Sequence, residues 1–183
     1  MKFKLSHLSS LVWGFAEATV FFIVPDVVLS LITLKSPRSG FIACLYALGG
    51  ALIGGILMFQ MAQIYPSATR SLLLALPGIH ATQLQTVQTQ IAQQGATAIF
   101  LGPLYGLPYK LYVVNGAWAG QPLWLILLLS LPARLLRFAF SVIITAGCNR
   151  VLTNFTNKYS ISLSICLLWW LIFYTWYFCH FSK

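Results

Sequence analysis

Five long apolar runs constrain the fold of this chain more than any other feature. They cover residues 8–34, 41–64, 96–119, 122–147 and 160–181. Each run holds the roughly 20 apolar residues that a helix needs to cross the hydrocarbon core of a bilayer. Only 7% of the 183 residues are charged and 59% are hydrophobic, whereas a soluble domain carries about 25% charged residues. We therefore expect an all-α integral membrane protein.

The first apolar run is too long for a secretory signal peptide. It exceeds the ~7–15 residues of a signal h-region, and no clear small-x-small cleavage site closes it. We expect this run to be retained in a multi-pass protein of the bacterial inner membrane.

The net charge of +9 is explained by the ends of the apolar runs. Most basic residues lie there, at Lys2, Lys4, Lys35, Arg38, Arg70, Arg150, Lys158 and Lys183. Basic residues at these places contact lipid headgroups and set topology. We expect membrane lipids as partners and no nucleic-acid binding.

Residues 77–95 form the one polar segment, which is rich in Gln and carries no charge. Leu84, Val87 and Ile91 follow helical spacing in it. This pattern predicts an amphipathic helix, either at the membrane interface or packed across the protein. The segment divides the chain into two halves.

The two halves have the same plan: a broken apolar run followed by a long apolar span. Corresponding hydrophobic segments broken by Gly or Pro are typical of transporters built from repeats. We predict a single membrane domain over residues 1–183. Its parts are a first repeat (8–64), a connecting helix (77–95), a second repeat (96–147) and a C-terminal transmembrane helix (160–181).

The break in the second half is the stronger one. Gly102, Pro103, Gly106 and Pro108 fall within the stretch GPLYGLPYK, and no continuous helix comfortably tolerates that density of Gly and Pro. Irregular backbone at membrane depth must be buried in protein or line a wet cavity. We predict that this segment enters the membrane and turns back as a re-entrant hairpin.

The break in the first half depends on Pro25 alone. A single proline can merely kink a spanning helix, and that alternative stays open. A continuous helix over residues 8–34 would run for about 40 Å, which exceeds a hydrocarbon core of about 30 Å. The segment must therefore tilt strongly or fold back at Pro25.

The only two acids of the chain, Glu17 and Asp26, lie inside the first apolar run. A charged residue at the centre of a spanning helix costs at least ~2.5–3.5 kcal/mol, so each acid needs a partner or a proton. We expect them to face Lys110 and Arg137 of the second half across a polar cavity. Arg134 is expected to snorkel to the interface.

Two readings of this charged cluster remain open. Burial and neighbouring cations act on a carboxylate in opposite directions, which could let Glu17 or Asp26 change protonation state near neutral pH. The alternative is a buried ion-pair network that only fixes the packing of the two hairpins.

The sequence offers little for enzymatic chemistry. No Ser-His-Asp or Cys-His arrangement, no metal-ligand spacing and no nucleotide-binding loop is present. The four cysteines lie in or beside apolar segments and are expected to be small core residues. We expect no catalysis, no metal and no cofactor.

Residues 90–138, QIAQQGATAIFLGPLYGLPYKLYVVNGAWAGQPLWLILLLSLPARLLRF, resemble the DedA family, also called the SNARE-associated Golgi protein (VTT domain) family. Gly95, Gly102, the Pro/Gly-rich turn, Asn115-Gly116 and Pro122 follow the order of the family motif. In the first half, Glu17 ahead of Pro25-Asp26 looks like the family's acidic N-terminal hairpin. The family's first motif arginine falls on Pro103 and its second on Tyr109 or Lys110, where Lys110 keeps a positive charge.

The resemblance implies two opposed re-entrant hairpins in an inverted repeat. It also implies flippase- or scramblase-like movement of an anionic lipid, such as undecaprenyl phosphate or a phospholipid. Lys110 and Arg137 would bind the headgroup, and proton movement through Glu17 or Asp26 could couple the cycle. The alternatives are a proton-coupled small-ion transporter and a non-catalytic membrane scaffold for envelope or lipid assembly.

Overall fold

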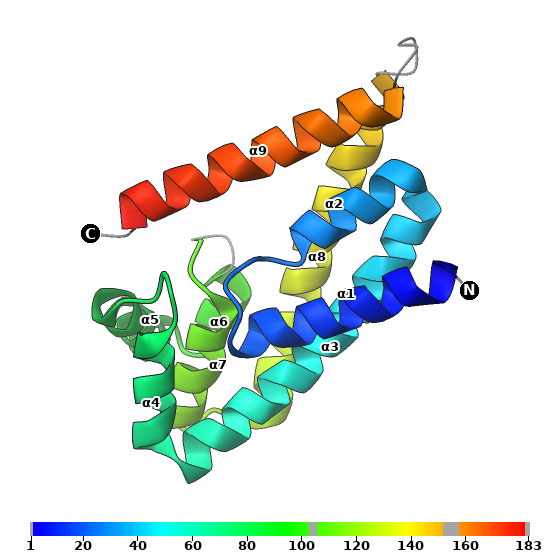
Figure 1. Ribbon diagram of the computed structural model, residues 1–183. Helices are drawn as coiled ribbons and strands as arrows, with labels where there is room; N and C mark the ends of the chain where they lie inside the picture. The colour runs from blue at the N-terminus through cyan, green and yellow to red at the C-terminus, as the bar shows by residue number, and fades with distance from the viewer. Residues whose placement is uncertain (1, 103–105, 152–157, 182–183) are drawn as a thin grey trace.

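The computed structural model describes residues 2–102, 106–151 and 158–181 (Figure 1). All regular structure in these residues is helical, which confirms the all-α prediction. The helices are α1 (Lys2–Thr19), α2 (Asp26–Lys35), α3 (Pro37–Ile64), α4 (Pro66–Ala75), α5 (Ala81–Gln94), α6 (Thr97–Leu101), α7 (Tyr109–Trp118), α8 (Leu123–Val151) and α9 (Lys158–Phe181).

Three of the described helices are long and apolar enough to cross a membrane. The spans are Pro37–Ile64 in α3, Leu123–Val151 in α8 and Tyr159–Tyr177 in α9. Large apolar side chains stand exposed along all three, for example Ile53, Leu136 and Leu168. An apolar surface of this extent is typical of a protein that faces lipid.

Both predicted breaks interrupt the helices. The first lies between Thr19 and Asp26, and Figure 1 shows the chain turning back there from α1 into α2. The second lies between Leu101 and Tyr109. The first apolar run is therefore broken between two helices and is not one kinked helix.

The residues of the two breaks act as their types suggest. Pro25 precedes the first residue of α2, and Pro108 precedes the first residue of α7. Gly106 has a φ of 75°, a left-handed conformation that favours glycine. Gly102 caps the C-terminal end of α6. A Cβ at this position would overlap the ring of Tyr112. Pro103 lies outside the described residues.

The helices next to the breaks pack on the long helices of both halves. The arms before the breaks pack on the span of their own half, α1 on α3 and α6 on α8. The arms after the breaks also reach the span of the other half: α2 packs on α8 as well as on α3, and α7 packs mainly on α3. The two halves of the chain are therefore interlocked around the breaks.

Small residues bring α1 and α3 into close contact. A Cβ at Gly14 would overlap the backbone of Ala47, and a Cβ at Gly50 would overlap the Leu11 carbonyl. Small residues on a shared face let helix backbones approach closely, as in many membrane-protein interfaces. This contact fixes the position of α1, and with it the position of Glu17.

The polar segment contains the predicted amphipathic helix. α5 buries Leu84, Val87 and Ile91 and packs on α6 and α7. Gln83 forms a capping box with His80 at its start. The short helix α4 was not predicted from the sequence, although Pro66 at its first position is a typical helix start.

The last helix, α9, matches the predicted C-terminal helix over residues 160–181. It packs on α2 and α8, and it is the separate orange-to-red helix of Figure 1. Most of its side chains are exposed. One of its faces nevertheless turns toward the two breaks and α8.

Candidate functional site

Each of the two acids forms an ion pair with an arginine of α8. Glu17 Oε2 lies 2.6 Å from Arg134 Nη2, and Asp26 Oδ2 lies 2.8 Å from Arg137 Nη2. Because the arginines are three residues apart, they project from neighbouring turns of one helix face. One stretch of α8 therefore binds both arms of the first hairpin.

The expectation that Arg134 snorkels to the interface is wrong. Its side chain is only 3% exposed. Its guanidinium carbon lies 4.0 Å from the centre of the Tyr109 ring, an arrangement in which the ring attracts the cation. The Glu17 carboxylate and the Tyr109 ring offset part of the cost of burying this arginine, whose Nε and Nη1 have no hydrogen-bond partner among the described residues.

Arg137 is placed differently from Arg134. Its side chain is 34% exposed, while the carboxylate that it binds, on Asp26, is only 3% exposed. Asp26 Oδ1 has no hydrogen-bond partner among the described residues. Arg137 can therefore reach a second anion while its contact to Asp26 is in place.

Lys110 does not pair with either acid, contrary to the predicted arrangement. Its Nζ donates to the backbone carbonyl of Phe21, 2.7 Å away in the first break. In the described part of the chain, ion pairs join the two acids only to arginines. The side chain of Lys110 therefore links the start of α7 to the first break while its charge has no paired carboxylate.

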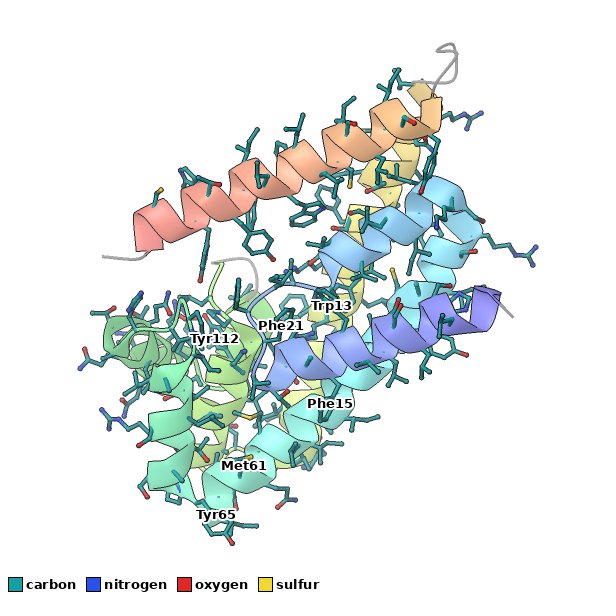
Figure 2. All side chains as sticks on the ribbon, in the orientation of Figure 1. Trp13, Phe15, Phe21, Met61, Tyr65 and Tyr112 are labelled. Carbon is teal, nitrogen blue, oxygen red and sulfur yellow. The ribbon has the colours of Figure 1, made fainter. Side chains whose placement is uncertain are left out.

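Two further side chains satisfy the backbone of the first break. The indole of Trp13 donates to the Ile23 carbonyl at 3.0 Å, and the Val24 amide donates to the Tyr174 hydroxyl at 2.8 Å. Figure 2 shows Trp13 and Phe21 beside the segment that leaves α1, where their rings meet edge to face. Irregular backbone at membrane depth needs such partners.

These aromatic residues were not recognised as site residues in the sequence. Trp13 lies in an ordinary apolar run, and Tyr174 lies in an aromatic stretch that is typical of an interfacial anchor. Tyr109 was considered only as a position in the family motif. A polar hydroxyl inside an apolar helix, as at Tyr174, is the sequence feature that could have indicated a buried hydrogen bond.

A cavity of about 390 Å³ lies where the two breaks meet, and we call it the charged cavity. It contains Glu17, Lys110 and Arg137, three of the four charged residues predicted for the site. Asp26 does not line the cavity and reaches it only through Arg137. The other lining residues are Phe21, Phe22 and Val24, Pro77 to Ile79, Gly106 to Pro108, and Phe173, Tyr174, Trp176 and Tyr177 of α9.

The charges around this cavity do not balance. Three cations, Lys110, Arg134 and Arg137, stand against two carboxylates, Glu17 and Asp26. With all five groups ionised, one positive charge remains uncompensated. A buried charge is costly without a partner, so the cavity favours an anion.

No metal site accompanies the cavity. In the described ranges, His, Cys, Asp and Glu side chains form no group of three or more that could hold an ion.

The chain matches no protein-family model, no curated protein and no solved structure in the comparisons.

Proposed function

We propose that this protein moves an anionic lipid across the bacterial inner membrane, in which it is a multi-pass protein. The headgroup binds in the charged cavity between Lys110 and Arg137, and the process involves no covalent chemistry. One observation carries the proposal: an uncompensated positive charge beside a cavity where two helix breaks meet. Lipid phosphate is the abundant anion that a cationic site at membrane depth would meet.

The arrangement of the helices supports two re-entrant hairpins in an inverted repeat. Two related and opposed halves would pack in this way, with α2 of the first half on α8 of the second and α7 of the second half on α3 of the first. Both breaks line the same cavity, as breaks do in transporters whose site lies between repeats. The resemblance to the DedA family points the same way.

The two cations of the site have different roles in this proposal. Arg137 offers a planar guanidinium that can bind two phosphate oxygens. Lys110 supplies the charge without a paired carboxylate and, having three donor hydrogens, can keep its bond to Phe21 while it binds an anion. The Asp26 carboxylate competes with the headgroup for this guanidinium.

Transfer of a labelled lipid between the leaflets of liposomes tests the proposal. We expect wild-type protein to move an anionic lipid faster than empty vesicles, and Lys110→Gln to lose most of this activity. The glutamine amide can still donate to the Phe21 carbonyl, so this substitution removes the charge and keeps a donor. Lys35→Gln, at an exposed lysine at the end of α2, is the matched control.

The outcomes separate the alternatives. Transfer no faster than in empty vesicles rejects lipid movement and favours a scaffold. Transfer that is unchanged in Lys110→Gln rejects the charged cavity as the headgroup site. Movement of small ions without movement of lipid favours the ion-transporter alternative.

A further inference from the structure

A second cavity, of about 440 Å³, lies between α2, α8 and α9. We call it the apolar cavity. Leu34, Phe140, Ile144, Ile165 and Trp169 are among its lining residues, and no charged residue lines it.

Four of the five hydroxyl and amide side chains that line the apolar cavity already bond to protein groups. Ser30 donates to the Asp26 carbonyl at 2.7 Å, and Thr145 donates to the Ser141 carbonyl at 2.8 Å. Asn149 accepts from Ser162 at 3.0 Å and donates to the Leu34 carbonyl at 3.2 Å. The cavity therefore suits a hydrocarbon group better than a polar one.

The same face of α8 lines both cavities in succession. Arg137 lines the charged cavity, and Phe140, Ser141, Ile144 and Cys148 line the apolar cavity. Steps of three and four residues place these side chains on one helix face. Cys148 follows Arg137 by 11 positions, which is about 16 Å of helix, so the two cavities follow one another along α8.

The facing side of α9 shows the same order in reverse. Cys166 and Trp170 line the apolar cavity, and Phe173, Tyr174 and Tyr177 line the charged cavity. Trp170 contacts Phe173 and Tyr174, with ring centroids 5.7 and 6.2 Å apart. These touching rings join the lining of the apolar cavity to that of the charged cavity.

We propose that the apolar cavity holds the hydrocarbon chain of the anionic lipid whose headgroup binds at Lys110 and Arg137. This inference rests on the proposed function. An anionic lipid needs a site for its headgroup next to a site for its hydrocarbon chain. The facing sides of α8 and α9 line both cavities, one after the other. The apolar cavity also lies between two candidate membrane spans, where an acyl chain can enter from the bilayer.

Photocrosslinking in lipid nanodiscs tests this inference. Phosphatidic acid and phosphatidylcholine would carry the same acyl chain with a diazirine, and mass spectrometry would map the adducts. We expect phosphatidic acid to give several-fold more adducts than phosphatidylcholine in residues 140–149 and 162–170. Adducts at Ile53 and Leu57, exposed on α3, should be equal for the two lipids.

Two substitutions on α9 give a matched pair for the same experiment. Cys166→Phe fills the apolar cavity from a half-buried position and should reduce the enrichment several-fold. Cys179→Phe makes the same change at an exposed position that lines neither cavity, and should leave the enrichment intact. Lys110→Gln should abolish the enrichment because the headgroup is no longer held.

Each other outcome overturns a distinct claim. If phosphatidic acid is retained in a Lys110-dependent way but its adducts lie elsewhere, the chain site is wrong and the headgroup site stands. If enrichment persists in Lys110→Gln, the two cavities do not share one ligand. If phosphatidic acid shows no preference over phosphatidylcholine anywhere, the headgroup site fails and the chain site falls with it.

Discussion

Glu17 and Asp26 form similar ion pairs, but their arginines differ in surroundings. Arg134 is buried under Tyr109, whereas Arg137 is one-third exposed and lines the charged cavity. Removing one partner of a buried pair leaves an uncompensated charge, which is far more costly than removing both. The Glu17–Arg134 pair therefore suits a structural role, and the Asp26–Arg137 pair suits a role in binding.

The difference predicts how the protein responds to loss of Glu17. Glu17→Gln should lower the free energy of unfolding by about 3–5 kcal/mol because Arg134 stays buried without a carboxylate. Adding Arg134→Met should recover much of this loss. Thermal unfolding in detergent measures both effects, with Arg38→Met as the exposed control. A double variant no more stable than Glu17→Gln would contradict the assignment.

A second prediction concerns Asp26 and pH. Asp26 binds Arg137 through Oδ2, and its Oδ1 has no partner among the described residues. In liposomes, we expect lipid transfer by the wild type to respond to a pH difference across the membrane. Asp26→Asn should lose this response, while Asp26→Glu keeps a titratable group and should retain it. A full response in Asp26→Asn would exclude Asp26 as the coupling group.

At the scale of helices, the sequence predicted the elements better than their contacts. Apolar run length and Gly/Pro density are local signals, and they located α3, α8, α9 and both breaks. The pairing of each acid with its arginine depends on how α1 and α2 approach α8, which no local pattern encodes. The buried position of Arg134 and the role of Tyr174 were missed for that reason.

The contact between α1 and α3 gives a prediction with a control at the neighbouring residue. A Cβ at Gly50 would overlap the Leu11 carbonyl, whereas nothing lies within 4 Å of a Cβ at Gly49. Gly50→Ala should destabilise the fold by about 1–3 kcal/mol through overpacking. Gly49→Ala should be neutral or stabilising by up to about 1 kcal/mol, as expected for Gly→Ala in a helix. Thermal unfolding that ranks the two variants equally would contradict this packing.

At the scale of the whole molecule, basic residues collect at one end. Lys35 and Arg38 flank the turn between α2 and α3, and the contact from Asn149 to the Leu34 carbonyl brings Arg150 there too. Arg70 lies in α4, beyond the far end of α3, a helix about 42 Å long. Because basic residues favour the cytoplasmic side of a membrane, we propose that this end faces the cytoplasm.

This charge distribution predicts the orientation in the membrane. In a variant without native cysteines, Ser67→Cys should react with a membrane-impermeant maleimide in intact cells. Pro37→Cys, at the basic end, should react only after the membrane is opened; both positions are exposed. The reverse labelling pattern would invert the orientation.

The placement of both arginines on one helix of a chain with only two acids has an evolutionary consequence. The sequence has no third Asp or Glu that could replace Glu17 or Asp26. A relative that loses one of these acids must therefore also change the paired arginine or keep an unpaired positive charge. Positions 17 and 134 should therefore vary together among relatives, and so should positions 26 and 137. Position 110 should instead keep a cation whatever happens to the pairs.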